Sequence, residues 1–133
     1  MEFGSVTVRG ENVAAVLSEL TGPKRAMNRT RYLADSFGMI AWERWDSWRT
    51  NSDLMVAVVM ELRDDRTCEV AVLAGGGGEG AMGLDWSVSS VVADHLLGAE
   101  RSAEAAAFEE AIEALEDTCD SLELTIDIDG EAG

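Results

Sequence analysis

Several residue types that build common catalytic and metal sites are scarce in this chain. A single histidine, His95, rules out a histidine-rich metal site within one chain. Cys68 and Cys119 stand fifty-one positions apart without a CxxC pattern, so we expect buried, reduced thiols. The longest apolar run, residues 54–60, is too short to cross a bilayer, and no apolar stretch near Met1 has the length of a signal peptide. These absences predict a cytoplasmic protein with no cofactor, no metal and no membrane partner.

Basic residues are also scarce, and lysine most of all. The chain has 10 Lys and Arg, of which only one is Lys, against 26 Asp and Glu, for a net charge of −16. Nine of the ten basic residues lie in residues 1–66, and sixteen of the acids lie in residues 67–133. Such a charge repels itself in dilute buffer and is screened in molar salt, where the Debye length falls to about 3 Å. The composition is typical of a cytoplasmic protein from a salt-loving prokaryote; the alternative is an ordinary acidic protein with an unusually acidic C-terminal helix.

The charge disfavours nucleic acid as a partner, because phosphate binding requires a basic face. One local exception is a cluster of four basic residues without an intervening acid: Lys24, Arg25, Arg29 and Arg31. We expect it to be a solvated loop whose arginines pair with the acidic half of the same molecule.

The chain length fits one domain, residues 1–133, with an acidic C-terminal helical region over about 99–133. Alternation predicts a strand over residues 5–9, and helical spacing of apolar residues predicts a helix over 11–21 that ends at Gly22 and Pro23. Residues 24–36 are polar and basic, which indicates a loop. Strands are then expected over residues 37–48, 54–62 and 67–74, as an antiparallel meander. The nearly continuous apolar stretch 54–62 is typical of a strand buried on both faces or flanked by a helix layer.

The second half predicts a further strand over residues 81–86, a helix over 88–97 capped by Ser87, an interruption at Gly98, and an alanine-rich helix over 103–122. Residues 124–129 alternate between apolar and polar, as in an edge strand. The predicted fold class is two-layer α+β. An antiparallel twisted sheet of about four to six strands carries the N- and C-terminal helices on one face, with a helix-grip arrangement as the leading variant.

No pattern of residues defines a catalytic site. Gly75, Gly77 and Gly80 fit G-x-G-x-x-G, but the next helix starts only near Ser87 and the preceding strands are antiparallel, which disfavours dinucleotide binding. Two interpretations of this loop remain: a tight hairpin, and a flexible segment at the edge of a ligand site. For His95 we expect a structural hydrogen bond, because nothing supplies a nucleophile turn or an oxyanion hole.

Three tryptophans, Trp42, Trp45 and Trp48, fall in one predicted strand. The two-residue period puts Trp42 and Trp48 on one face and Trp45 on the other. Core packing accounts for one face. A dimer contact or an apolar ligand pocket is the competing interpretation of the other, and it makes a homodimer the favoured assembly.

Two short signatures resemble a family of small uncharacterised prokaryotic α+β domains. The first is the Trp-Arg-Thr-Asn-Ser stretch at 48–52, which matches an aromatic-Arg-x-Asn-Ser segment; the second is the Gly-rich loop at 75–80 leading to Asp85 and Trp86. The similarity covers roughly residues 1–100, although Ser-Val-Ser at 87–89 replaces an expected Gly-Ala-Glu. The family brings no activity, so the resemblance implies the fold and the proximity of the two segments.

The sequence therefore favours a non-enzymatic binding or interaction domain with no catalytic residue. The alternative is a small enzyme acting on an anionic metabolite, with Arg29, Arg31 or Arg49 as anchors and Asp85 as an acid or base. In both cases a small anionic ligand would bind beside the Gly-rich loop, whose exposed amides and a guanidinium suit an anion. The expected ligand-binding residues are Arg49, Asn51, Gly77, Gly78, Asp85 and Trp86.

Overall fold

The structure is a computed structural model that describes residues 1–46, 52–76 and 90–128, with side chains over 1–44, 54–76 and 103–127. The elements in chain order are β1 (Glu2–Arg9), the 3-10 turn η1 (Val13–Ala15), α1 (Val16–Glu19), β2 (Met27–Leu33), β3 (Phe37–Asp46), β4 (Ser52–Asp64), β5 (Thr67–Gly75), α3 (Ser90–Ser121) and β6 (Thr125–Ile128).

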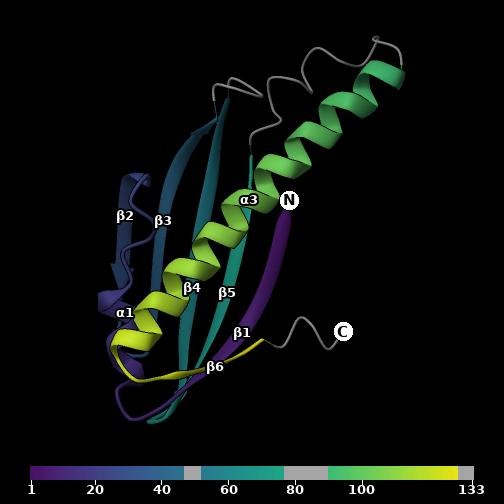
Figure 1. The fold of residues 1–133 in the computed structure, drawn as a ribbon. Helices are drawn as coiled ribbons and strands as arrows, with labels where there is room; N and C mark the ends of the chain where they lie inside the picture. The colour runs from purple at the N-terminus through teal and green to yellow at the C-terminus, as the bar shows by residue number, and fades with distance from the viewer. Residues whose placement is uncertain (47–51, 77–89, 129–133) are drawn as a thin grey trace.

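Six strands form one antiparallel sheet in the order β2-β3-β4-β5-β1-β6. The long helix α3 runs diagonally across one face of this sheet, and its N-terminal turns project beyond the ends of the strands (Figure 1). The short helix α1 packs against the same core. The predicted α+β class, the meander, and the placing of both helices on one face are therefore confirmed, and β6 is the predicted edge strand.

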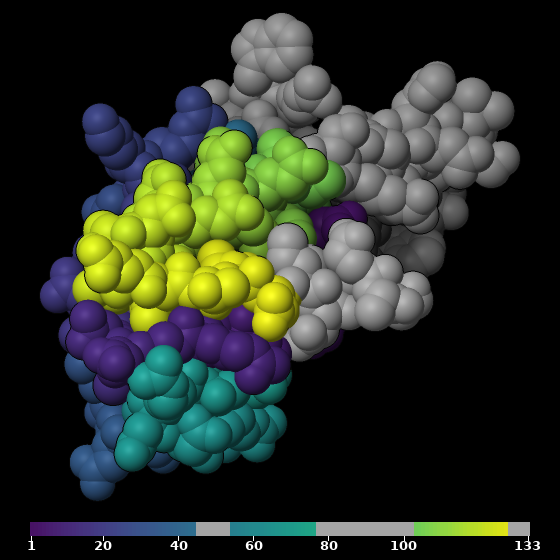
Figure 2. Space-filling view, turned by 60° about the horizontal axis from the view of Figure 1, so that its bottom comes forward, coloured from purple at the N-terminus to yellow at the C-terminus, as the bar shows by residue number. Residues whose placement is uncertain are grey.

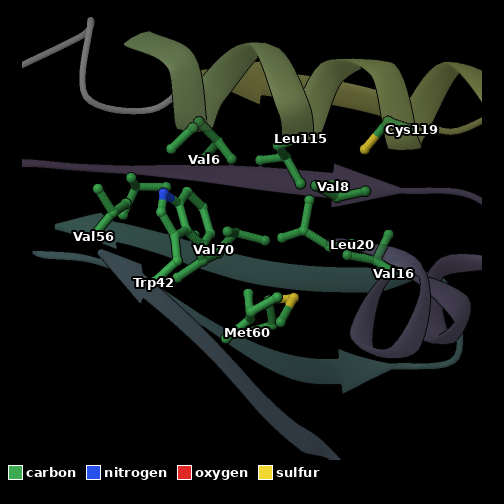
Figure 3. Close-up of a cluster of buried hydrophobic side chains, with 14 of the residues drawn as sticks. Val6, Val8, Val16, Leu20, Trp42, Val56, Met60, Val70, Leu115 and Cys119 are labelled. Carbon is green, nitrogen blue, oxygen red and sulfur yellow. The ribbon is translucent and has the colours of Figure 1, made fainter. Parts of the chain in front are cut away.

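The core lies between the sheet and α3. Residues of β1, β4 and β5 that point toward the helix are buried at every second position, as strand geometry requires. The buried apolar residues of α3 recur at every fourth position and form one narrow stripe against the sheet: Ala103, Ala107, Ala111, Leu115 and Cys119. Leu115 and Cys119 point from α3 toward β1 in Figure 3. The alanines let the helix approach closely, while Leu115 contributes about 2 kcal/mol of burial free energy.

Two predicted boundaries were wrong for identifiable reasons. Residues 24–36 contain an edge strand, β2, rather than only a loop. Six of its seven residues are exposed, so no apolar alternation marks it in the sequence, and its charges suit an unpaired edge. The second wrong prediction is the helix break at Gly98, since α3 continues through this residue. One glycine costs only about 1 kcal/mol relative to alanine, which a helix this long tolerates.

The predicted helix over 11–21 is shorter than expected. It divides into η1 and the single turn of α1, although Val13, Val16, Leu17 and Leu20 are all buried as the spacing indicated. Asn12, the residue before the turn, makes no side-chain capping bond, so the helix lacks a stabilised start. The strand expected over 81–86 and the cap expected at Ser87 lie outside the described residues.

Candidate functional site

All six expected ligand-binding residues lie outside the described residues: Arg49, Asn51, Gly77, Gly78, Asp85 and Trp86. The strand ends that flank their two segments are described. Asp46 of β3 pairs with Ser52 of β4, and Gly75 of β5 pairs with Met55 of β4. Both segments therefore begin at the same end of the sheet, as the meander requires; whether their side chains meet stays a prediction.

Arg29 and Arg31 of the basic cluster are engaged within the fold. Arg31 donates from Nη1 to the Leu17 carbonyl at 2.7 Å and from Nη2 to the Leu20 carbonyl. Arg29 donates from Nε to the Thr21 carbonyl at 2.7 Å and from Nη2 to the Pro23 carbonyl at 2.8 Å. These bonds satisfy carbonyls at and after the C-terminus of α1 and attach β2 to it. Both guanidiniums stabilise the fold, which weakens their proposed use as anion anchors.

The remaining arginines near this cluster contact the acidic helix. Arg44 of β3 donates from Nε and Nη2 to the two carboxylate oxygens of Glu110, at 3.1 and 3.3 Å. Arg25 lies 3.7 Å from the same carboxylate. The Arg44 side chain is only 12% exposed, so this bidentate pair links the sheet to α3 in a partly desolvated place. The expectation that the basic cluster pairs with the acidic half is confirmed for Arg25.

Two hollows flank the helix layer. One, of about 330 Å³, lies between the α1–β2 loop and α3 and is lined by Lys24 together with Glu110, Glu113 and Asp117. No group of three or more potential metal ligands occurs among the side chains that the structure describes. The second, of about 340 Å³, lies where the β4–β5 turn, β1 and the chain around β6 meet, at the end of the molecule seen in Figure 2.

Two ion pairs lie near this second hollow. Arg66 lies 3.5 Å from Glu11, and Arg9 donates to Asp127 at 3.2 Å. Gly10 has a φ of 149°, which L side chains rarely adopt, and an added Cβ would also lie 2.4 Å from Leu124 Cδ2, so this position favours glycine. Among the described residues that line the two hollows, no nucleophile lies beside a base.

The sulfhydryls of Cys68 and Cys119 are buried and free, as predicted. Burial raises the pKa of each thiol from about 9 to about 11, and nearby carboxylates reinforce the increase. The thiolate, which is the reactive form, is therefore suppressed at neutral pH. These positions support structure rather than redox chemistry.

The raised thiol pKa predicts a loss of stability in mild alkali. Between pH 9 and about 11 the folded thiols keep their protons while unfolded thiols release theirs, so the free energy of unfolding falls as the pH rises. The loss is on the order of 2 kcal/mol per thiol. Urea denaturation at stepped pH should show a smaller alkaline decline for the double variant Cys68→Ala/Cys119→Ala. Parallel pH profiles for the two proteins would contradict the assignment.

The side of the sheet opposite α3 carries an apolar surface. Strand parity puts onto this side, here called the open face, Phe3, Ser5, Thr30, Tyr32, Met39, Ala41, Ala57, Val59, Ala71 and Leu73, with Met55 beside them. No described helix or strand packs against it (Figure 1). Phe3, Tyr32 and Met55 are 63%, 59% and 56% exposed, and the aliphatic residues between them are half-buried.

Sequence reasoning left the open face unassigned, although it contained the signal. Both the odd and the even positions of residues 54–62 are mostly apolar. This pattern fits a strand that is buried on both faces, and it also fits a strand that one helix layer covers on a single face. In the structure, Leu54, Val56, Val58 and Met60 contact the helix layer, whereas Met55, Ala57 and Val59 face away from it. Trp42 belongs to the buried side, which confirms its predicted core role; the side chains of Trp45 and Trp48 lie outside the described part.

Comparisons with known proteins place the chain in no established group: no family model, curated protein or solved structure matches it. The resemblance to a family of small α+β domains stays a prediction. Among the described helices, none is long and apolar enough to cross a membrane.

Proposed function

We propose that this protein is a non-enzymatic interaction domain that binds a protein partner through the open face. The observation that carries the proposal is an uncharged, solvent-exposed apolar surface spread over five strands. Large exposed apolar patches are uncommon on monomeric proteins, and they mark interaction surfaces when polar residues rim them. Glu43, Glu61 and Glu69 lie at the margins of the open face, in strand register with the apolar rows.

The distribution of charge supports a partner on this side. Between residues 103 and 121, α3 carries seven acids and no basic residue. On the opposite side of the sheet, the ten positions in the two central rows of the open face carry no charge, and Glu43, Glu61 and Glu69 lie beyond these rows. Repulsion and solvation are therefore concentrated on the helix layer, and desolvation of the open face costs little.

The enzyme alternative has less support in the described residues. Two of its three proposed anchors, Arg29 and Arg31, already donate to backbone carbonyls. Arg49 and Asp85 lie outside the described part. The proposal of an interaction domain rests on described side chains alone.

A fluorescent hydrophobic dye tests whether the open face binds apolar groups. At the lowest workable protein concentration, we expect the wild type to bind the dye and Ala57→Arg, at the centre of the face, to bind several-fold less. The matched control is Ala34→Arg, an equal change at an exposed position in the β2–β3 turn; it should bind dye like the wild type. Equal dye binding by all three proteins would refute the open face as the binding surface.

A further inference from the structure

We infer that the partner is a second copy of this chain, packed face to face across a two-fold axis that runs along β4. This inference rests on the proposed function and names the partner for the same surface. The observations that carry it are the arrangement of side-chain sizes, a hollow in the open face, and the position of the charge.

Strand register arranges the open face into two rows that cross the sheet from β1 to β2. The first row consists of Phe3, Leu73, Ala57, Ala41 and Thr30. The second row consists of Ser5, Ala71, Val59, Met39 and Tyr32. In the first row the large side chains lie on β1 and β5 and the small ones on the other strands. In the second row the small side chains lie on β1 and β5 and the larger ones on the other strands.

This arrangement is complementary to itself. A two-fold axis along β4, lying between two stacked sheets, brings β1 over β2 and β5 over β3 of the other copy. In the first row, Leu73 then meets Ala41. In the second row, Ala71 meets Met39 and Ser5 meets Tyr32. Each of these contacts away from the axis pairs a large side chain with a small one, which is how interdigitated sheets fill space, while Ala57 and Val59 meet their own copies on the axis.

A hollow in the open face accepts the exposed ring of Phe3. The hollow has a volume of about 360 Å³ and is lined by Thr30, Met39, Ala41 and Met55 of the open face together with Asn28, Trp42 and Glu43. It lies beside the register shift of β2, where Asn28 adopts a φ of 52°. The same two-fold axis puts Phe3 of one copy opposite Thr30 of the other, at this hollow. The Phe3 side chain is 63% exposed in one copy. In the dimer, the hollow of the second copy would bury its ring.

Charge also favours this arrangement over contact between helix layers. Two chains of net charge −16 associate most readily where their acid-rich helices stay apart. Of the three glutamates at the margin of the open face, this axis brings only Glu61 of β4 toward its own copy, and molar KCl screens that pair. In a face-to-face pair the two α3 layers lie outermost, three layer spacings of about 10 Å apart. That separation of roughly 30 Å exceeds the Debye length of about 10 Å at 0.1 M salt.

The area of the open face fits a weak dimer. Five strands spaced about 4.8 Å apart, with two rows of side chains that each take about 7 Å along the strands, make a flat area of roughly 300 Å² per copy. Protruding side chains such as Phe3 and Tyr32 raise the accessible area above this value. A standard interface buries about 800 Å² per partner, so we expect this pair to be weaker than a standard dimer.

Sedimentation equilibrium in about 2 M KCl, which removes most repulsion, tests the dimer. We expect the wild type and Ala34→Arg to form dimers, and Ala57→Arg and Phe3→Arg to be monomers. Phe3→Arg changes a side chain that is exposed in one copy, so its fold should persist, with an unchanged circular dichroism spectrum. A monomeric wild type at all concentrations overturns the inference, as does a dimer that survives both open-face substitutions.

A mixing experiment tests the two-fold axis itself. Phe3→Arg and Thr30→Glu are prepared separately and combined at about 0.15 M KCl. The mixture forms one wild-type Phe3–Thr30 contact and one opposite-charge contact, so we expect at least tenfold tighter association than for either variant alone. No gain on mixing overturns the proposed axis. A further outcome separates the two proposals. If the wild type is monomeric but Ala57→Arg still lowers dye binding, the open face remains the proposed interaction surface, and the second copy is refuted as its partner.

Discussion

Raising KCl from about 0.1 M to about 2 M is expected to raise the melting temperature by roughly 5–10 °C, because salt screens repulsion along the outer face of α3. Six pairs of acids in this helix stand three or four positions apart, so they are neighbours on its surface: 109 with 113, 110 with 113, 113 with 116, 113 with 117, 116 with 120, and 117 with 120. Like-charge pairs at such spacing each cost about 0.2–0.5 kcal/mol, or roughly 1–3 kcal/mol together. Thermal melts followed by circular dichroism measure the effect.

The variant Glu113→Gln gives a sharp control, because Glu113 takes part in four of the six pairs. At low salt its melting temperature should exceed that of the wild type, and the difference should vanish in 2 M KCl. Glu19→Gln, an exposed change on α1, removes the same charge away from this helix and should leave a smaller difference. A wild-type melting temperature that stays flat or falls with salt would refute both the repulsion and the salt-adapted interpretation of the composition.

Much of the fold follows from local sequence patterns, and the exceptions have long-range causes. The meander from β3 to β5 could be predicted because its strands are rich in apolar residues and polar turns separate them. The strand β2 could not, because its stability comes from pairing with β3 and from bonds that Arg29 and Arg31 make to carbonyls around α1. Those partners belong to other elements of the chain, so the local sequence of β2 does not reveal them. An exposed edge strand also has no apolar periodicity of its own.

The candidate binding surface was harder to predict than the fold. Apolar side chains on both faces of residues 54–62 indicate that both faces are buried. They do not indicate which element or partner covers each face. Only the tertiary arrangement puts both helices on the side of Val56 and leaves Ala57 and Val59 uncovered by any described element. The six residues expected around the Gly-rich loop rested on turn chemistry and resemblance, which fix no side-chain contact.

The two faces of the sheet should respond very differently to truncation. Trp42→Ala is expected to lower the free energy of unfolding by about 3–5 kcal/mol, because Trp42 is among the largest fully buried side chains. Its ring packs against Gly22, where an added Cβ would lie 3.0 Å from it, so little backbone movement can fill the resulting cavity. Met55→Ala, one position from the buried Leu54 and Val56 but on the open face, should change the free energy by less than about 0.5 kcal/mol.

Urea denaturation in the Ala57→Arg background, where association is removed, makes this comparison within a monomer. If Trp42→Ala fails to fold, Trp42→Phe should still destabilise more than Met55→Ala. A cost for Met55→Ala close to that of Trp42→Ala would mean that the chain itself covers the open face, and the interaction proposal would fall. A small cost means that Met55 and its neighbours remain apolar without stabilising the single chain, and burial against a partner then gives their hydrophobicity a physical role.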